Sequence, residues 1–196
     1  MDSQRARVLI WATPLLAVAI FLASGKAEQL GKDPMSEAPA NPEMARLAAA
    51  LAGDWDITET MEKSQFFPNG GARHGHAHVY LAAGGSILVD DVHSNGSAGK
   101  LDGLVVLWWD RAAKNYGYFT CFNDPENPCR QRGTAHWQGN VLVNDWQETV
   151  DGKMTKFRDS FVDITPNSHR LVAAIDTGKG SMRTMITTTS KRRPPK

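Results

Sequence analysis

The sequence predicts an all-β domain, an up-and-down antiparallel β-barrel of eight to ten strands with a short N-terminal helix. From Asp54 onward, apolar and polar residues alternate with a period of two, which is typical of strands. Short turn sequences such as Asn95-Gly96 and Asp151-Gly152 separate these stretches, and links this short join antiparallel neighbours. No helix interrupts the series, and closure removes the two unpaired edges of such a meander. A two-sheet sandwich is the alternative.

The composition agrees with one globular domain. The chain has 196 residues, of which 41% are hydrophobic and 22% charged, and this excludes a disordered or multi-span membrane protein. The formal net charge of +1 gives no reason to expect a nucleic-acid partner. Two cysteines cannot build a disulfide-dense miniprotein or a four-cysteine zinc site.

Residues 1–27 are predicted to be a secretory signal. Arg5 and Arg7 precede the uncharged, mostly apolar run Val8–Ala23, and small residues follow up to Ala27. The run is shorter than the ~18–20 residues of a spanning helix, so no stable membrane span is expected after cleavage, although an uncleaved anchor is the alternative. Cleavage after Ala27 leaves a mature chain of net charge −1, expected in the periplasm or outside the cell. Residues 28–40 are polar, with two prolines, and are predicted to be a linker.

The barrel domain is expected over residues 41–190. Asn41 and Pro42 mark the start of a short helix with apolar residues at helical spacing, and Gly53 ends it. Residues 191–196 are predicted to be a basic tail. The strands are expected at about residues 54–63, 72–82, 86–94, 103–110, 115–122, 130–138, 140–149, 153–165, 168–176 and 181–189.

The segment Gly53-Asp54-Trp55, placed directly after the helix, resembles the Gly-x-Trp signature of lipocalins and other calycins. The resemblance implies that Trp55 closes the barrel floor and that a basic side chain from the last strand lies across it by cation–π contact. Arg183, Lys191 and Arg192 are the candidates, and the sequence does not separate them. We name Arg183 with Trp55 as the expected floor pair.

The chain from Leu51 onward also resembles the secreted bacterial lipocalin-like proteins of a domain-of-unknown-function family. The segments that carry the resemblance are LAGDWDITETM, FFPNGG, GGSILVDDVHS, WWD and ITTTSK. The resemblance implies a calycin-like barrel outside the cytoplasm and no established activity.

A barrel of this size either fills its lumen with side chains or holds one small ligand. The alternation places one or two polar residues on each apolar strand face, and a ligand pocket uses such groups, whereas a packed core avoids unpaired carboxylates. A register error of one residue would turn every assignment outward. The predicted ligand-binding residues are Trp109 and Trp146 as apolar anchors, with Glu59, Asp91, His93 and Asp159 orienting a polar end.

The segment Leu104–Trp109 is apolar at six successive positions, so both of its faces need cover. The helix or a loop is the expected cover for the outer face, and a homodimer across this strand is the alternative.

His74, His76 and His78 alternate and therefore point to the same side of one strand, where two imidazoles could grip a metal. The opposite face of that strand is apolar and suits the interior, so a solvent-facing histidine row is the preferred interpretation. His93 beside Asp90 and Asp91 is a candidate acid–base pair or haem ligand, although a hydrogen-bonded wall histidine is the more ordinary role.

Cys121 and Cys129 bracket a seven-residue turn, and in an oxidising compartment they are expected to form a structural disulfide.

The function that these features favour is binding of one small, largely hydrophobic molecule in the lumen, without a cofactor and without chemical change. The chain lacks a nucleophile elbow, a P-loop, a dinucleotide fingerprint and a zinc-protease motif, which argues against an enzyme. An isomerase or cyclase that uses luminal carboxylates and histidine, or a metal- or haem-binding barrel, are the alternatives.

Overall fold

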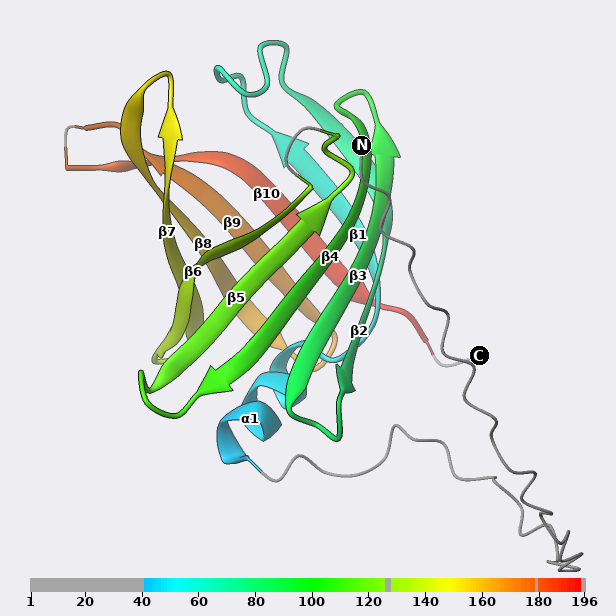
Figure 1. The fold of residues 1–196 in the computed structure, drawn as a ribbon. Coiled ribbons are helices and arrows are strands. Elements are labelled where there is room, and N and C mark those ends of the chain that lie inside the picture. The colour runs from blue at the N-terminus through cyan, green and yellow to red at the C-terminus, as the bar shows by residue number, and fades with distance from the viewer. Residues whose placement is uncertain (1–40, 126–127, 179, 195–196) are drawn as a thin grey trace, which may run out of the picture. The chain divides into compact units, whose positions relative to one another are not determined.

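In the part of the chain that the structure describes, ten antiparallel strands form a closed up-and-down barrel with one helix at one end (Figure 1). The computed structural model describes residues 41–125, 128–178 and 180–194. Each strand pairs with its sequence neighbours, and β1 pairs with β10 to close the cylinder. The elements are α1 (Pro42–Leu51), β1 (Gly53–Met61), β2 (Gly71–Ala82), β3 (Ile87–Gly96), β4 (Gly99–Asp110), β5 (Asn115–Phe122), β6 (Cys129–Gln138), β7 (Val141–Val150), β8 (Lys153–Thr165), β9 (Ser168–Asp176) and β10 (Met182–Arg192).

The predicted fold class is confirmed, and all ten expected strands are present with small shifts at their ends. The largest shifts are at β4, which begins at Gly99 instead of about residue 103, and at β10, which continues to Arg192, two residues into the segment expected to be a tail. Pairing with the adjacent strand β1 explains the longer β10, since Trp55 and Asp56 are the partners of Arg192 and Lys191. The predicted signal and linker lie outside the described residues.

The helix α1 plugs one end of the barrel. Asn41 caps it by accepting a hydrogen bond from the Glu43 amide at 2.9 Å. Its buried side chains Met44, Leu47 and Leu51 join a core made by inward-facing strand residues. The Tyr116 hydroxyl donates to the Glu43 carbonyl at 2.9 Å, so β5 is tied to the helix backbone.

The predicted floor tryptophan lies beneath α1, and its basic partner is Arg192. Trp55 is 1% exposed and donates its indole N–H to the Leu51 carbonyl. The guanidinium carbon of Arg192 lies 4.2 Å from the Trp55 ring centroid, and its Nη1 donates to the Ala52 carbonyl. Our choice of Arg183 was wrong: it is exposed near the start of β10, whereas Arg192 is the register partner of Trp55.

The glycine of the Gly-x-Trp segment makes room for this arginine. A Cβ on Gly53 would lie 2.0 Å from Arg192 Nη1, and the backbone φ of +143° is one that other residues rarely adopt. The absence of a side chain at residue 53 therefore makes room for the guanidinium over Trp55.

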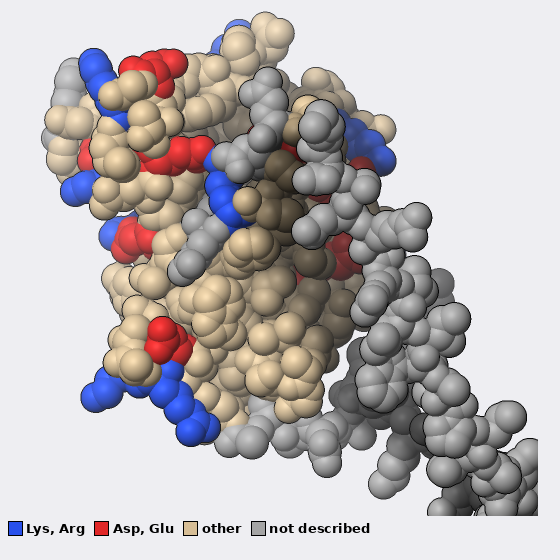
Figure 2. Space-filling model, viewed as in Figure 1, with Lys and Arg blue, Asp and Glu red and all other residues tan. Residues whose placement is uncertain are grey.

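The outer face of β4 is not covered by the helix, which was one of the covers expected for the apolar segment 104–109. α1 packs on inward-facing residues at the barrel end, so it does not cover the outer side of this strand. Leu104 is 36% exposed, and Val106 and Trp108 are half-buried. Figure 2 shows a largely uncharged expanse over β4 and β5.

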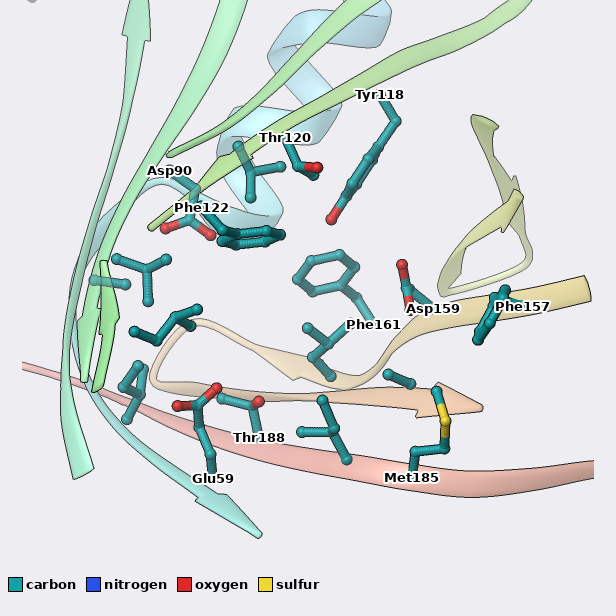
Figure 3. A pocket seen from close by; sticks show the side chains of 18 of the residues that line it. Glu59, Asp90, Tyr118, Thr120, Phe122, Phe157, Asp159, Phe161, Met185 and Thr188 are labelled. Carbon is teal, nitrogen blue, oxygen red and sulfur yellow. The ribbon is translucent and has the colours of Figure 1, made fainter. Parts of the chain in front are cut away.

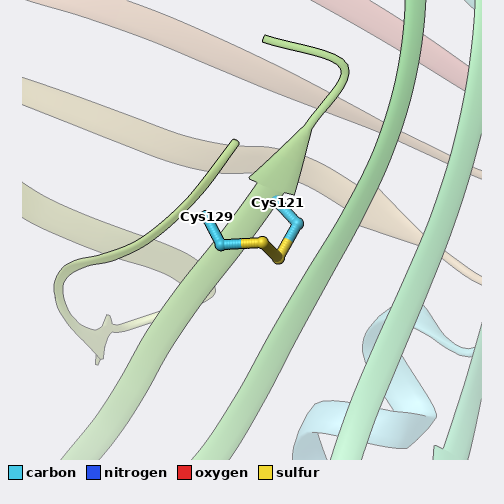
Figure 4. Close-up of a disulfide and its surroundings, with 2 residues drawn as sticks. All are labelled: Cys121 and Cys129. Atoms are coloured by element: carbon cyan, nitrogen blue, oxygen red, sulfur yellow. A yellow bond between two sulfur atoms is a disulfide. The ribbon is translucent and has the colours of Figure 1, made fainter. Parts of the chain in front are cut away.

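The expected disulfide between Cys121 and Cys129 is present (Figure 4). The two cysteines are direct register partners on β5 and β6, so the bond closes the turn that joins these strands. Separately, none of the helices in the described part of the chain is long and apolar enough to span a bilayer.

Candidate functional site

The barrel encloses a cavity of about 550 Å³ between α1 and the loops of the opposite end. Its wall is mostly aromatic and aliphatic, and Figure 3 shows Tyr118, Phe122 and Phe161 facing one another across it. Pockets that hold one small organic molecule fall in this range of volume and combine apolar walls with few polar groups. Four carboxyl groups lie among the lining residues: Glu59, Asp90, Glu148 and Asp159.

Glu59 from β1 is the most buried of the predicted polar residues. It is 5% exposed, and Arg73 of β2 forms an ion pair with it, with 2.9 Å between Nε and Oε2. The Ser94 hydroxyl of β3 donates to the same carboxylate oxygen at 2.5 Å. A buried charge needs such partners, since an unpaired carboxylate loses its hydration without compensation.

Trp146 and Asp159, two of the predicted ligand-binding residues, both line the cavity and contact each other. The Trp146 indole donates to Asp159 Oδ2 at 3.0 Å, and the Asn144 amide donates to the same atom at 3.2 Å. Trp146 also stacks on Phe157, with the ring centroids 4.1 Å apart and nearly parallel. This part of the wall is therefore a flat aromatic surface with an oriented carboxylate beside it.

Asp90 from β3 is a luminal carboxyl group that the sequence reading placed on the outside. Its register partners are Val79 on β2 and Val105 on β4, so its immediate neighbours in the wall are apolar. Asp90 Oδ1 is buried and has no hydrogen-bond partner among the described residues. Burial, and secondarily the charge of Asp91, raise the pKa of Asp90 to about 7.

His169 from β9 lines the cavity beside the floor tryptophan. Its ring contacts Trp55 edge to face, with centroids 4.5 Å apart, and its Nδ1 has no hydrogen-bond partner within the described ranges. Burial, and secondarily the charge of Arg192, lower the pKa of His169 to about 4. The imidazole is therefore neutral at physiological pH.

The end of the cavity away from α1 is bordered by loops and by one ion pair. Arg130 of β6 and Glu148 of β7 pair through Nη1 and Oε1, and both line the cavity. Phe66 and Phe67 reach the same cavity from the loop between β1 and β2. Phe66 is 41% exposed, so an aromatic ring stands between the lumen and solvent.

Three of the six predicted ligand-binding residues lie elsewhere. Asp91 and His93 point outward, because the face of β3 that enters the barrel carries Leu88, Asp90 and Ser94. On the outer face of the barrel, His93 pairs with Asp91 and Asp102. His93 Nδ1 lies 2.9 Å from Asp102, and this hydrogen bond raises the pKa of His93. Both faces of this strand mix apolar and acidic residues, so alternation alone did not choose between them.

Trp109 points inward but lies at the plugged end rather than in the cavity. Its ring packs edge to face on Tyr116, with centroids 5.0 Å apart, and Tyr116 is bonded to α1. Its role is to fill the floor. The inward direction was predictable from the sequence, but its height along the barrel axis was not.

The histidine row of β2 faces outward, as its preferred interpretation held. His78 lies 2.7 Å from Asp54, His74 lies 3.2 Å from the Thr58 hydroxyl, and the His76 and His93 rings are 5.3 Å apart. In the described ranges no group of three or more His, Cys, Asp or Glu side chains is arranged to hold a metal ion.

Several cavity residues were missed by the sequence reading. Asp90 would have been found by the opposite choice of face on β3. Thr120 and Phe122 share an inward face of β5 that the alternation already showed. Arg73 and His169 gave no signal, since a charged or titratable residue near a strand end is ordinarily solvated.

Comparison with known proteins adds a fold relationship. No family model and no curated protein sequence matches the chain. Among solved structures, the barrel is similar to the S-type phycobiliprotein lyase CPES from Guillardia theta, with a TM-score of 0.52 and 12% identity over 77% of this chain and 93% of that one. The resemblance to a secreted bacterial family stays a prediction. At this identity the likeness concerns the fold alone, and the chain has the closed, calycin-like β-barrel fold.

Proposed function

We propose that this protein binds one small, largely hydrophobic molecule in its barrel lumen and leaves it chemically unchanged. The observation that carries the proposal is the cavity of about 550 Å³, lined by aromatic rings and plugged at one end. A barrel packed solid by its own side chains would have no such space. The structural similarity to a phycobiliprotein lyase supports a barrel of the right type without indicating the ligand.

Within this proposal, three residues have distinct roles. Trp146, stacked on Phe157, supplies a flat apolar contact for the ligand. Glu59 and Asp159 keep fixed positions through their hydrogen bonds and present polar edges to the lumen. Apolar area gives the affinity, and the few oriented polar groups give selectivity.

Fluorescence titration of the purified protein tests the proposal. N-phenyl-1-naphthylamine, an apolar fluorescent probe, should bind with a stoichiometry of one and quench Trp146. The variant Trp146→Phe should lose part of this quenching, since Trp55 also lines the cavity, whereas Trp109→Phe, the matched control at the plugged floor, should keep it. Absence of saturable binding, combined with native mass spectra that show no retained small molecule, would reject a binding role.

Catalysis on a luminal molecule is the second candidate, and Asp90 is the observation that favours it. A buried carboxyl with a pKa of about 7 can exchange a proton with a bound substrate at neutral pH, as an isomerase requires. Mass and NMR analysis of the bound molecule before and after incubation separates the two candidates, because only catalysis changes its structure.

The expected surroundings and assembly state belong to this proposal as well. A periplasmic or secreted location is supported by the disulfide and by the signal-like segment 1–27. A homodimer across β4 is the partner that its outer face would fit, since Leu104 is 36% exposed there. N-terminal sequencing of the exported protein and light scattering after gel filtration test these two points.

A further inference from the structure

Four histidines lie together on the outer wall of the barrel, where β2 and β3 run side by side (Figure 1). They are His74, His76 and His78 of β2 and His93 of β3. His76 and His93 are direct register partners, and 5.3 Å separates their ring centroids. The row continues to Asp102 on β4, which is the register partner of His93. Imidazoles and carboxylates therefore meet on the outer surface of three adjacent strands.

His76 differs from the other three imidazoles, because it has no hydrogen-bond partner in the part of the chain that the structure describes. Each of the others is bonded to a hydroxyl or a carboxylate, as described above. The His76 side chain is exposed, and its ring lies beside that of His93 with 38° between the ring planes. An accessible neutral imidazole is the form of histidine that binds transition metals. His76 can therefore turn toward an ion held by His93 without breaking a hydrogen bond.

His93 is held in position by carboxylates at both ring nitrogens. Asp102 lies 2.9 Å from Nδ1, and Lys100 Nζ fixes Asp102 in turn at 2.6 Å. Histidines that bind metals commonly have such a carboxylate on the nitrogen that faces away from the ion, and it orients the ring. On the other side, Asp91 Oδ1 lies 3.1 Å from Nε2. This separation is within the range of about 3.0–3.5 Å that two donor atoms on one zinc ion adopt.

The distance between the two imidazole rings also fits a single ion. With Zn–N bonds of about 2.0–2.1 Å and tetrahedral angles, the ring centroids of two imidazoles on one zinc ion lie about 5 Å apart. The 5.3 Å between His76 and His93 is close to this value. Three donor groups do not yet converge within the described ranges, so rotation of the His76 ring completes the set. Imidazole donors favour zinc over magnesium and calcium, which prefer oxygen donors alone.

We propose that His76, His93 and Asp91 bind a zinc ion on the outer face of the barrel, with a water molecule as the fourth ligand. Asp102 is the positioning residue that orients His93. The ion takes the place of the hydrogen between His93 Nε2 and Asp91, and that proton passes to solvent. The site connects β2 and β3 from outside and does not involve the lumen, so it goes beyond the proposed binding function and does not depend on it.

Calorimetric titration of the untagged, chelator-treated protein with zinc chloride at pH 7.5 tests the inference. The wild type should bind one equivalent of zinc, and an excess of magnesium should not displace it. His76→Asn and His93→Asn should each weaken zinc binding by at least about tenfold, since loss of even an orienting partner has that effect. Asp102→Asn should weaken it by about tenfold, and the conservative Asp102→Glu should restore part of the affinity.

The matched control is His74→Asn, because His74 lies on the same face of β2, two residues before His76, and is bonded to Thr58. It should leave the zinc affinity unchanged. All of these side chains lie on the outer face, so the variants are expected to fold, which circular dichroism checks. The inference is overturned if the wild type binds no zinc, if binding survives both His76→Asn and His93→Asn, or if His74→Asn weakens it equally.

Discussion

The substitution Asp90→Asn should stabilise the protein at alkaline pH more than at acid pH. In the folded state the pKa of this carboxyl is raised to about 7, whereas in the unfolded chain it returns to the ordinary value of 3.8. Between these values the unfolded chain has released the proton and the folded protein retains it. The unfolded state therefore binds fewer protons, and the free energy of unfolding falls as pH rises through this window.

The magnitude follows from the size of the shift. One pKa unit corresponds to 1.36 kcal/mol, so a shift of about three units gives an upper bound of about 4 kcal/mol. Water in the cavity next to Asp90 reduces this penalty, and we expect about 2–4 kcal/mol. Above pH 7 both states are ionised and the penalty is constant.

Urea unfolding followed by circular dichroism, at pH 4.5 and pH 8, measures this effect. From pH 4.5 to pH 8, the free energy of unfolding of Asp90→Asn should rise by about 2–4 kcal/mol relative to that of the wild type. Asp91→Asn should show less than half of this rise relative to the wild type, because the Asp91 charge is the smaller cause of the raised pKa of Asp90. A difference that stays constant with pH, or that favours the variant at acid pH, would refute the reasoning.

Three further variants test the cavity histidine, the barrel floor and the disulfide. His169→Phe should reduce the loss of stability between pH 6.5 and pH 4. In this range the histidine of the unfolded chain takes up a proton, whereas the buried histidine, with a pKa of about 4, does not. Unfolding curves measured across this pH range check the prediction. Gly53→Ala should displace Arg192 and cost about 1–3 kcal/mol in chemical denaturation, and a variant as stable as wild type would contradict the contact at 2.0 Å. Replacing Cys121 and Cys129 by serine should lower stability by about 2–3 kcal/mol, and reduction of the wild type should give the same loss.

The fold could be predicted from the sequence because its signals are local and repeated. Most strands alternate, most turns carry Gly, Asn, Asp or Pro, and consecutive strands pair with each other, so the closing pair β1 and β10 was the one distant pairing that had to be inferred. Closure was expected because it removes the two unpaired edges of the meander. The arginine of the floor pair was harder to predict from the sequence, since the choice among Arg183, Lys191 and Arg192 depends on which residue of β10 is the register partner of Trp55.

The site was only half predictable, for reasons that differ between residues. Asp159 lies between Phe157 and Phe161 on one face of β8, and that face had to be inside. β3 carries Asp90 and Asp91 side by side between apolar residues, so either face could have been luminal. The structure decides for Asp90 because its strand neighbours Val79 and Val105 are inward-facing.

The plug formed by α1 has a consequence for how the lumen exchanges its contents. With Tyr116 tied to the helix backbone, the route to solvent runs past the loop that carries Phe66 and Phe67. Changes in the part of this loop that does not line the cavity can alter the rates of uptake and release together, leaving their ratio nearly constant. Changes in the strands alter the ratio itself. Evolution can therefore adjust residence time and affinity through separate parts of the chain.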